Sequence, residues 1–354
     1  MGLRGSDWRM PAEWEEHEAT WLAWPHEKSD WPGKFEPIHW VYGEFVRYVS
    51  HCERVVMLCR DAAATKRARQ VLRMSGARME AVEFRVRPTN RSWARDYCPM
   101  FVWGPDDRLA IVDWLFNGWA KYPNWELDNE VPAWASLKLG IARVPTDIVL
   151  EGGAIDVNGH GSVLTTEECL LGKVQARNPG MTRRQWERAL KRHLGVTNVL
   201  WLGRGIVGDD THGHVDDLAR FVNPTTVVAA VEDDPNDDNY EPLRDNLERL
   251  ERMRDQDGRP FEVVRLPMPR PVWFDGQRLP ASYANFYIAN RFVLVPTFND
   301  PADRYALRVL ASVFLDRTVV GIHCRDLVLG LGTLHCMTQQ QPGYRKSIGE
   351  IPGA

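Results

Sequence analysis

Cys336 is the residue of this sequence with the most informative chemical surroundings. It lies in Gly-Leu-Gly-Thr-Leu-His-Cys-Met-Thr-Gln-Gln-Gln-Pro, near the end of the sequence. A free cysteine is usually a small buried hydrophobic residue. Cys336 departs from that pattern because His335 adjoins it, glycines precede it and a polar run of glutamines follows it. A nucleophilic cysteine must be a thiolate supported by a cation or local dipoles, and a cationic substrate can supply that support.

The segment Asp210-Thr-His-Gly-His-Val-Asp216 carries two imidazoles and two carboxylates in alternate positions. If the segment is extended, all four side chains point to one side, an arrangement that is costly without a role. Three interpretations stay open. The segment could be a cluster of turn and helix-cap residues. It could bind a transition metal through His212, His214 and Asp216. Alternatively, His214 is a general acid/base and the aspartates bind a cation.

Two further segments place a carboxylate in surroundings that suit a cation or an imidazole. In Trp93-Ala-Arg-Asp96, the tryptophan offers a ring face and the aspartate a bidentate acceptor. The alternative is a surface Arg95–Asp96 pair of little energetic worth. In Glu151-Gly-Gly153, the glutamate could orient a histidine, as in other acid–base sites, or the three residues could form only a turn.

The composition limits the classes of protein that this chain can belong to. It has 354 residues, of which 44% are hydrophobic, and its net charge is −4. The core can therefore be large, and the absence of a basic surplus argues against a nucleic-acid or anionic-membrane partner. No apolar run is long enough to span a membrane, and residues 1–14 lack an apolar signal core. With six sparse cysteines and no CxxC pair, we expect a cytoplasmic protein with reduced thiols.

Strand and helix patterns alternate along the chain, which predicts an α/β fold. No low-complexity linker divides the sequence, so we expect residues 1–354 to form a single domain. The expected strands are Arg54–Cys59, Val82–Val86, Leu109–Trp114, Ser162–Thr165, Asn198–Leu202, Thr226–Val231, Phe261–Leu266, Phe292–Pro296 and Val319–His323. The expected helices, whose apolar residues recur at helical spacing, are Ala62–Met74, Thr182–Leu194, Tyr240–Arg254 and Asp303–Phe314.

Several well-known functional motifs are missing from the sequence. It contains no GxxxxGK[ST] phosphate loop, no GxGxxG that opens a helix, no HExxH and no GxSxG. Nucleotide-binding, dinucleotide-binding and serine-hydrolase functions therefore lose support.

Taken in order, the segments around residues 93, 151, 210 and 336 resemble those of the agmatine deiminase group of the guanidino-group modifying superfamily. That group also contains the bacterial peptidylarginine deiminases. Further matching segments extend the resemblance over nearly the full chain: Met10-Pro-Ala-Glu-Trp-Glu, Trp21-Leu-Ala-Trp-Pro-His26, Phe116-Asn-Gly-Trp119, Lys121-Tyr-Pro, Arg177-Asn-Pro, Ser282-Tyr-Ala-Asn-Phe286 and Val295-Pro-Thr-Phe.

The resemblance implies a pseudo-fivefold α/β propeller of ββαβ-type units around a central active-site pocket. It also implies a homodimer that needs no metal or other cofactor and acts on a small-molecule guanidino substrate. The most specific expectation is conversion of agmatine and water to N-carbamoylputrescine and ammonia through a covalent thiouronium intermediate, a step of putrescine and polyamine biosynthesis. The roles carried over are Cys336 as nucleophile, His214 as general acid/base, Asp96 and Asp216 as guanidinium ligands, Glu151 as support for His214, Trp93 as channel lining and Asp210 as partner of the distal amine.

The sequence departs from the family pattern at a few positions. Cys98 stands where glycine is common, Arg91 where aspartate is common, and His212 and Thr333 where asparagine is common. None of these changes removes a catalytic group. His212 and Arg91 bear instead on the charge at the pocket mouth and therefore on the identity of the substrate.

Three alternatives to an agmatine hydrolase follow from the same residues. The first is deimination of another guanidino compound, either arginine or peptidyl arginine. The second is a metal-dependent hydrolase that uses His212, His214 and Asp216. The third is a binder of cations without catalysis, for which Cys336 would be dispensable.

Overall fold

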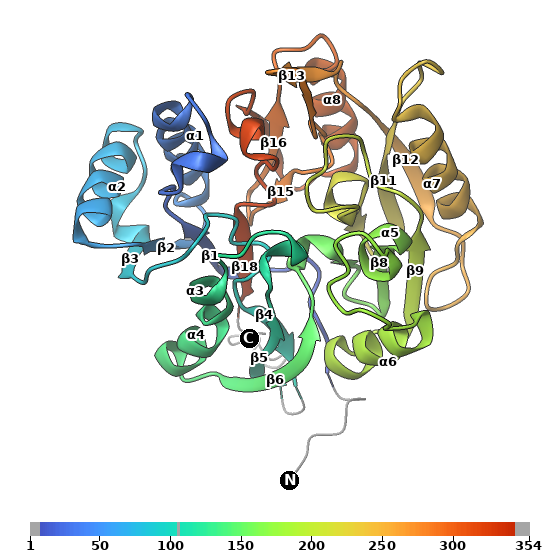
Figure 1. The fold of residues 1–354 in the computed structure, drawn as a ribbon, viewed down its shortest axis with the longest axis horizontal. Coiled ribbons are helices and arrows are strands. Elements are labelled where there is room, and N and C mark those ends of the chain that lie inside the picture. Colours follow the sequence, from blue (N-terminus) through green and yellow to red (C-terminus); the bar gives the residue numbers. More distant parts are fainter. Residues whose placement is uncertain (1–7, 105–106, 344–354) are drawn as a thin grey trace, which may run out of the picture.

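A recurring unit of one antiparallel and one parallel strand pair builds most of this mixed α/β fold, seen here in a computed structural model (Figure 1). The structure describes residues 8–104 and 107–343. Within these residues the strands form five sheets of three or four strands and one separate two-stranded hairpin. The α/β class expected from the sequence is confirmed.

The first sheet joins strands from both ends of the described chain. In spatial order its strands are β18 (Thr338–Pro342), β1 (His17–Ala23), β2 (Arg54–Cys59) and β3 (Val82–Val86). The helices α1 (Phe35–Val49) and α2 (Ala62–Met74) connect its parallel strands. Because β1 pairs antiparallel with β18, the loop that carries Cys336 is anchored beside the N-terminal strand.

The other four sheets repeat one order, in which an antiparallel pair is followed by a parallel strand reached through helices. Their strands are β4 (Met100–Trp103), β5 (Leu109–Leu115) and β6 (Ala142–Val149); β7 (Asp156–Val157), β8 (Ser162–Thr166) and β9 (Asn198–Leu202); β10 (Ala219–Asn223), β11 (Thr226–Val231) and β12 (Glu262–Pro267); β15 (Tyr287–Ile288), β16 (Phe292–Thr297) and β17 (Thr318–His323). The connecting helices are α3 (Glu126–Asn129), α4 (Val131–Leu139), α5 (Glu167–Leu171), α6 (Arg183–Leu194), α7 (Tyr240–Arg252) and α8 (Asp303–Val313). The separate hairpin is β13 (Val272–Phe274) with β14 (Gln277–Leu279).

Helix α6 shows how the sequence specifies one of these elements. Thr182 and Gln185 form a reciprocal capping box at its start, which satisfies backbone donors that have no partner within the helix. Trp186, Leu190 and Leu194 are buried along one face, as the helical spacing of apolar residues predicts. The helix ends at Gly195, whose φ of 71° suits glycine and whose missing Cβ leaves room for the Trp8 carbonyl.

The expected strands and helices are all present, with ends that differ from the expected positions by two residues or fewer. Residues 210–216 are not extended, which was the condition for placing their four ionisable side chains on one side. His212 and Gly213 have φ values of 65° and 98°, and the segment ends in a short 3₁₀ turn at Val215–Asp217. The backbone turns at these two residues, so the four ionisable side chains do not share one face.

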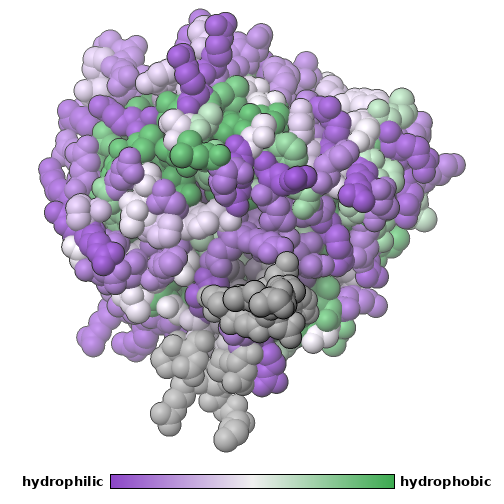
Figure 2. All heavy atoms as spheres, turned by 180° about the vertical axis from the view of Figure 1, so that it is seen from behind, coloured by the Kyte–Doolittle hydropathy of each residue, from purple (hydrophilic) through white to green (hydrophobic). Residues whose placement is uncertain are grey.

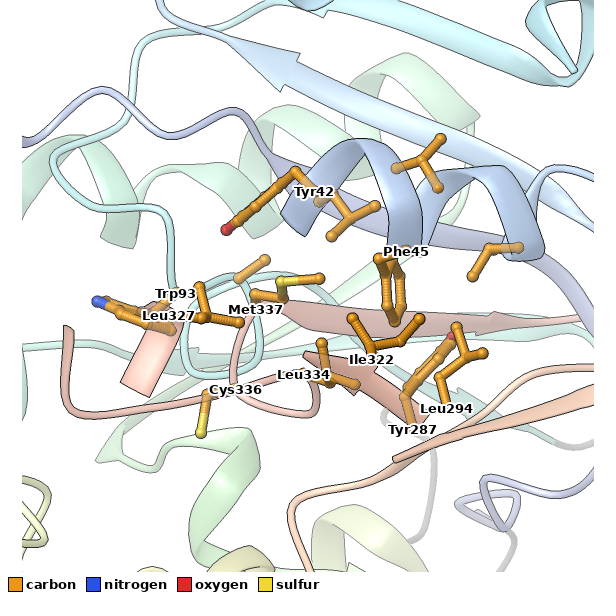
Figure 3. Close-up of a cluster of buried hydrophobic side chains, with 14 of the residues drawn as sticks. Tyr42, Phe45, Trp93, Tyr287, Leu294, Ile322, Leu327, Leu334, Cys336 and Met337 are labelled. Atoms are coloured by element: carbon orange, nitrogen blue, oxygen red, sulfur yellow. The ribbon is translucent and has the colours of Figure 1, made fainter. Parts of the chain in front are cut away.

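The largest hydrophobic cluster packs against one side of the loop that carries Cys336 (Figure 3). Residues of α1, β16, β17 and the loop itself contribute to it. Hydrophilic residues cover most of the face of the molecule that lies behind the view of Figure 1. Hydrophobic residues gather in the upper half of this face (Figure 2). Across residues 8–104 and 107–343, no helix combines the length and the apolar character needed to cross a membrane.

Candidate active site

The side chain of Cys336 is turned away from the hydrophobic cluster by the packing of its neighbours. Leu334 and Met337 point into the cluster and are fully buried, whereas Cys336 points away from it (Figure 3). Gly332 allows this close arrangement, because a Cβ there would lie 3.0 Å from the Cβ of Cys336. The local packing therefore presents one thiol to the space on the other side of the loop.

Asn285 fixes both the loop and the sulfur atom. Its Oδ1 accepts hydrogen bonds from Thr333 Oγ1 at 2.7 Å and from the His335 backbone N–H at 3.0 Å. Its Nδ2 lies 3.1 Å from Cys336 Sγ and donates to it. One buried amide thus determines the position of the thiol, and a donor at this distance favours the thiolate form.

A cavity of about 390 Å³ opens beside Cys336. Of the residues expected at the site, four line it: Trp93, Asp96, Asp210 and Cys336. His214, Asp216 and Glu151 are each 1% exposed or less and lie behind this wall, within a few ångströms of Asp96 or Cys336 as described below. The fold therefore brings all seven residues together at a single cavity.

Asp96 is held at the cavity wall by two neutral donors. Trp119 Nε1 donates to its Oδ2 at 2.8 Å, and the backbone N–H of Gly153 donates to its Oδ1 at 3.0 Å. Burial raises the pKa of Asp96 above its usual value, although the charge of His214 opposes that rise. The surface ion pair considered for Arg95 and Asp96 is wrong, because both residues are buried.

His214 lies among three carboxylates. Its Nδ1 is 3.9 Å from Asp96 Oδ1 and 4.0 Å from Asp216 Oδ1, and its Nε2 is 3.7 Å from Glu151 Oε2. Burial alone would lower the pKa of His214, but Asp96 and Glu151 raise it well above its usual value. The imidazole is therefore held in its protonated form, ready to donate a proton.

Asp216 owes its orientation to the histidine that precedes Cys336. His335 Nδ1 lies 2.7 Å from Asp216 Oδ2, and His335 Nε2 lies 2.7 Å from Glu13 Oε2. Each ring nitrogen of His335 therefore faces one carboxylate oxygen. Burial would raise the pKa of Asp216, but the hydrogen bond and charge of His335 lower it below its usual value. Asp216 is therefore a carboxylate, and its Oδ2 is 3.7 Å from Cys336 Sγ.

Buried arginines close this network on the side away from the cavity. Arg220 Nη2 is 3.0 Å from Glu13 Oε2, and Arg95 Nη2 is 3.3 Å from the same oxygen. Arg177 Nε donates to Glu151 Oε1 at 3.0 Å. Burial would raise the pKa of Glu151, but Arg177 and His214 lower it to about 2.

The two glycines after Glu151 allow neighbouring chain segments to pack closely against this part of the backbone. A Cβ at residue 153 would lie 2.4 Å from His214 Nδ1, and a Cβ at residue 152 would lie 2.2 Å from the Arg95 carbonyl oxygen. Neither distance is possible for a real side chain. The turn interpretation of Glu151-Gly-Gly153 is therefore incomplete, since the two glycines let the backbone pack against the imidazole and against the segment that carries Asp96.

Asp210 and Trp93 both line the cavity and are held there by neighbouring side chains. Tyr122 OH donates to Asp210 Oδ2 at 2.8 Å, and Lys121 forms an ion pair with Asp210 Oδ1. Trp93 Nε1 donates to Asp30 Oδ2 at 3.2 Å, which fixes the ring at the cavity wall. Asp210 is thus a carboxylate at the cavity wall that already attracts one primary amine.

The structure separates two other residues from this group. His212 Nε2 faces Glu168 Oε1 at 3.8 Å, and Cys98 is buried; the cavity lining in the described chain includes neither. Within the described residues, the three-ligand group that could hold a metal consists of Glu151, Cys169 and His214. The alternative of a metal site formed by His212, His214 and Asp216 is therefore not supported by this group of ligands.

Several residues that surround the site were not predicted individually from the sequence. Most of them stood inside segments that carried the family resemblance: Glu13, Trp119, Lys121, Arg177, Asn285 and His335. Arg220 and Cys169 gave no signal of this kind, because each lies within a strand or helix pattern that packing alone explains. Their partners are distant in the sequence, so only the fold reveals them.

The carboxylates also determine the state of the candidate nucleophile. Burial, and then the charges of Asp216, Asp217 and Asp96, raise the pKa of the Cys336 thiol well above its usual value. A cation between the sulfur and these carboxylates would reverse that effect. The arrangement can therefore hold a planar cation against a thiol, with an imidazolium beside it.

The chain is similar to a family of deiminases over nearly its whole length. Residues 9–342 match the family model described as Porphyromonas-type peptidyl-arginine deiminase. The chain is 37% identical to the agmatine deiminase of Stutzerimonas stutzeri strain A1501, covering 96% of each sequence. An agmatine deiminase of Enterococcus faecalis has a similar solved structure, with a TM-score of 0.89, 32% identity and coverage of 97% of this chain and 98% of that one.

A C. jejuni agmatine deiminase with substrate bound is also similar, with a TM-score of 0.86, 32% identity and coverage of 95% and 97% of the two chains. The fold and the site together define a deiminase-type hydrolase scaffold. The chain belongs to the Porphyromonas-type peptidyl-arginine deiminase family.

The raised pKa of Cys336 predicts slow alkylation of the free protein. At neutral pH, iodoacetamide should modify Cys336 at least about tenfold more slowly than an unstructured peptide thiol, because the thiolate is the reactive form and each pKa unit removes it tenfold. The rate should increase steadily as the pH rises toward 10. Peptide mass spectrometry identifies the site, and Cys336→Ser is the control. Rapid modification at neutral pH without an added cation would contradict the assignment.

Proposed function

We propose that the protein is a cysteine-dependent hydrolase that converts agmatine and water to N-carbamoylputrescine and ammonia. The observation that carries the proposal is the placement of Cys336, Asp96, Asp216 and His214 around one end of a cavity whose wall also presents Asp210. The similarity to agmatine deiminases over 96% of the chain supports the same activity.

In this proposal, Asp96 and Asp216 bind the guanidinium group. A guanidinium carbon is a poor electrophile because its charge is delocalised over three nitrogens. Two fixed carboxylates can localise that charge and orient the plane of the group toward the sulfur before attack. The donors to Asp96 from Trp119 and Gly153, and the contact of Asp216 with His335, supply the rigidity that this role requires.

The first half of the reaction forms the thiouronium intermediate. The bound cation lowers the pKa of Cys336, whose thiolate attacks the guanidinium carbon and forms a tetrahedral adduct. His214 donates a proton to one nitrogen, the carbon–nitrogen bond breaks and ammonia leaves. The raised pKa of His214 supports this step, because the ring still carries its proton at neutral pH.

The second half hydrolyses the intermediate. His214, now neutral, accepts a proton from water, and the resulting hydroxide attacks the thiouronium carbon. The carbon–sulfur bond then breaks, and the hydroxyl proton of the adduct passes to the departing sulfur. The ureido product forms and Cys336 returns to the thiol. Glu151 stabilises the imidazolium in both halves, and its low pKa keeps it ionised throughout.

Asp210 is the proposed partner of the distal amine of agmatine. Lys121 and Tyr122 already contact its two oxygens, so an incoming ammonium must share or displace the Lys121 contact. The carboxylate favours a substrate with a second positive charge over peptidyl arginine, which has none at that position.

Arginine is the second candidate substrate, and Arg91 is the residue that favours it. Its guanidinium lines the cavity and could pair with a substrate carboxylate. However, Arg91 already forms an ion pair with Asp30 and lies 4.3 Å from the centre of the Tyr122 ring. We therefore propose agmatine, rather than arginine, as the preferred substrate.

We further propose that the chain is one domain whose five sheets form a pseudo-fivefold propeller around the cavity. Four sheets with the same strand order, and the pairing of β1 with β18, support this arrangement. We also propose a homodimer in the cytoplasm. The hydrophobic residues gathered on the face shown in Figure 2 support a second copy, and six unpaired cysteines support a reducing compartment.

The activity predicts release of ammonia and a ureido product from agmatine, measured beside arginine and a short arginine peptide. Agmatine should give the highest kcat/KM. Cys336→Ala should lower turnover by at least about 10³-fold, because it removes the attacking atom. Cys52→Ala, which removes a more exposed thiol outside the cavity, should leave turnover intact.

Two results of that experiment would contradict the proposal. Full turnover by the Cys336→Ala variant would exclude the cysteine mechanism. No release from any of the three compounds by the folded protein would instead indicate a binder of cations, and equilibrium binding of agmatine would then identify it.

The role of Asp210 predicts a selective loss in Asp210→Asn. For agmatine, kcat/KM should fall roughly 10- to 100-fold, the effect of one lost charge-assisted contact. For a guanidine of the same length without the distal amine, it should change little. Asp275→Asn is the matched control, because it also removes a carboxylate from the cavity wall. Equal losses for both compounds would exclude amine recognition by Asp210.

A further inference from the structure

A second thiol lies close to His214. Cys169 is 2% exposed, and its Sγ, a carboxylate oxygen of Glu151 and a ring nitrogen of His214 all lie within 4.8 Å of one another. His214 Nε2 faces Glu151, whereas Nδ1 faces Asp96 and Asp216. None of the proposed catalytic steps uses this thiol.

Helix α5 and its cap bring Cys169 to this place. Thr166 Oγ1 accepts a hydrogen bond from the Cys169 backbone N–H at 3.1 Å and donates one to the Gly213 carbonyl at 2.6 Å. The start of the helix is thereby tied to the residue that precedes His214. The proximity of thiol and imidazole is therefore built into the backbone.

Two of the three groups are buried without hydrogen-bond partners. Glu151 Oε2 and both ring nitrogens of His214 have none, although their side chains are at most 1% exposed. The 3.7 Å between Glu151 Oε2 and His214 Nε2 is too long for a hydrogen bond. A buried polar atom without a partner costs about 1–3 kcal/mol, so a ligand that bonded to all three groups would recover that free energy.

We propose that Glu151, Cys169 and His214 form a binding site for a soft divalent cation such as Zn²⁺, and that occupation of this site inhibits the enzyme. Binding of the cation would release two protons to the solvent, one from the Cys169 thiol and one from Nε2 of His214. The resulting thiolate, imidazole nitrogen and carboxylate oxygen form a ligand set typical of zinc. Tetrahedral zinc separates such ligand atoms by roughly 3.3–3.6 Å. The observed 3.7 Å between the carboxylate and imidazole atoms needs only a small inward movement.

The surrounding charges set the strength of the site. Asp96 and Asp216, within 4.0 Å of the other ring nitrogen, favour a cation. Arg177 opposes it, because its guanidinium is hydrogen bonded to the other oxygen of Glu151. The donor set also selects the type of metal, since a thiolate ligand disfavours Mg²⁺ and Ca²⁺.

The mode of inhibition follows from the side of the ring that the metal would occupy, and it rests on the proposed acid–base role of His214. A metal on Nε2 leaves a proton only on Nδ1, so the ring can no longer alternate between donor and acceptor. The cation would lie behind the cavity wall rather than in the cavity. Inhibition by Zn²⁺ should therefore lower kcat and leave the KM for agmatine nearly unchanged.

Binding of Co²⁺ tests the site directly, without any enzymatic turnover. Co²⁺ added to the Cys336→Ala protein under a non-chelating reductant should give a thiolate-to-cobalt charge-transfer band and the visible bands of a tetrahedral site, with a stoichiometry of one. Zn²⁺ should displace it, and Mg²⁺ should not. Absence of the band in this protein would overturn the proposal.

Variants of the other cysteines identify the ligand. Cys169→Ser and Cys169→Ala, each made in the Cys336→Ala background and checked for folding, should bind Co²⁺ roughly 10- to 100-fold more weakly. Cys324→Ser, which removes another buried thiol, should not alter the band. A band that survives the loss of Cys169 would overturn the assignment.

The kinetic experiment separates the failure of this proposal from failure of the proposed function. If the wild-type protein hydrolyses agmatine, Zn²⁺ that raises KM alone would indicate binding in the cavity at Cys336 and would exclude the mode of inhibition proposed here. If the protein hydrolyses no guanidine, the cobalt spectrum still decides whether the metal site exists.

Discussion

The burial of several carboxylates in one small volume is the constraint on which the rest of this structure depends. Asp96, Glu151 and Asp216 are each less than 5% exposed, and like charges so close together repel strongly when they are removed from water. The chain supplies the compensating cations on the side away from the cavity, with Arg177 on Glu151 and His335 on Asp216. The side that faces Cys336 is therefore left with an excess of negative charge.

In the proposed mechanism, this excess of negative charge links the selection of the substrate to the activation of Cys336 as nucleophile. In the free protein, burial and then the nearby carboxylates raise the pKa of Cys336 and keep it as a thiol, and carboxylates raise the pKa of His214 and keep it as an imidazolium. A planar cation that enters the site neutralises Asp96 and Asp216 and supports the thiolate at the same moment. A neutral compound of the same shape would neither neutralise the two carboxylates nor support the thiolate. The site therefore becomes reactive only when a cation is present.

The sequence predicts the elements of this protein and indicates the residues proposed as reacting groups, because both depend on local patterns. The spacing of Trp186, Leu190 and Leu194 predicts helix α6, and the segments that contain Cys336 and Asp96 resemble those of a family with known chemistry. The sequence could not decide between an extended segment and a turn at residues 210–216, since alternation of polar residues does not reveal a left-handed backbone at His212.

The supporting network could not be predicted from the sequence for a different physical reason. Glu13 meets Arg95, Arg220 and His335, which are separated from it by 82 to 322 residues. Each of these residues alone suggests an ordinary surface charge. Only the pairing of β1 with β18 and the packing of the sheets remove them from water and make their mutual contacts necessary.

The most direct test of this account is the affinity of the Cys336→Ala protein for agmatine and for N-carbamoylputrescine, measured by calorimetry. The two compounds have nearly the same shape and the same distal amine. They differ because agmatine carries a charged guanidinium where N-carbamoylputrescine carries a neutral urea. The account predicts that agmatine binds about 100-fold more tightly, because only the cation completes the charge balance of Asp96 and Asp216. Equal affinities would contradict it.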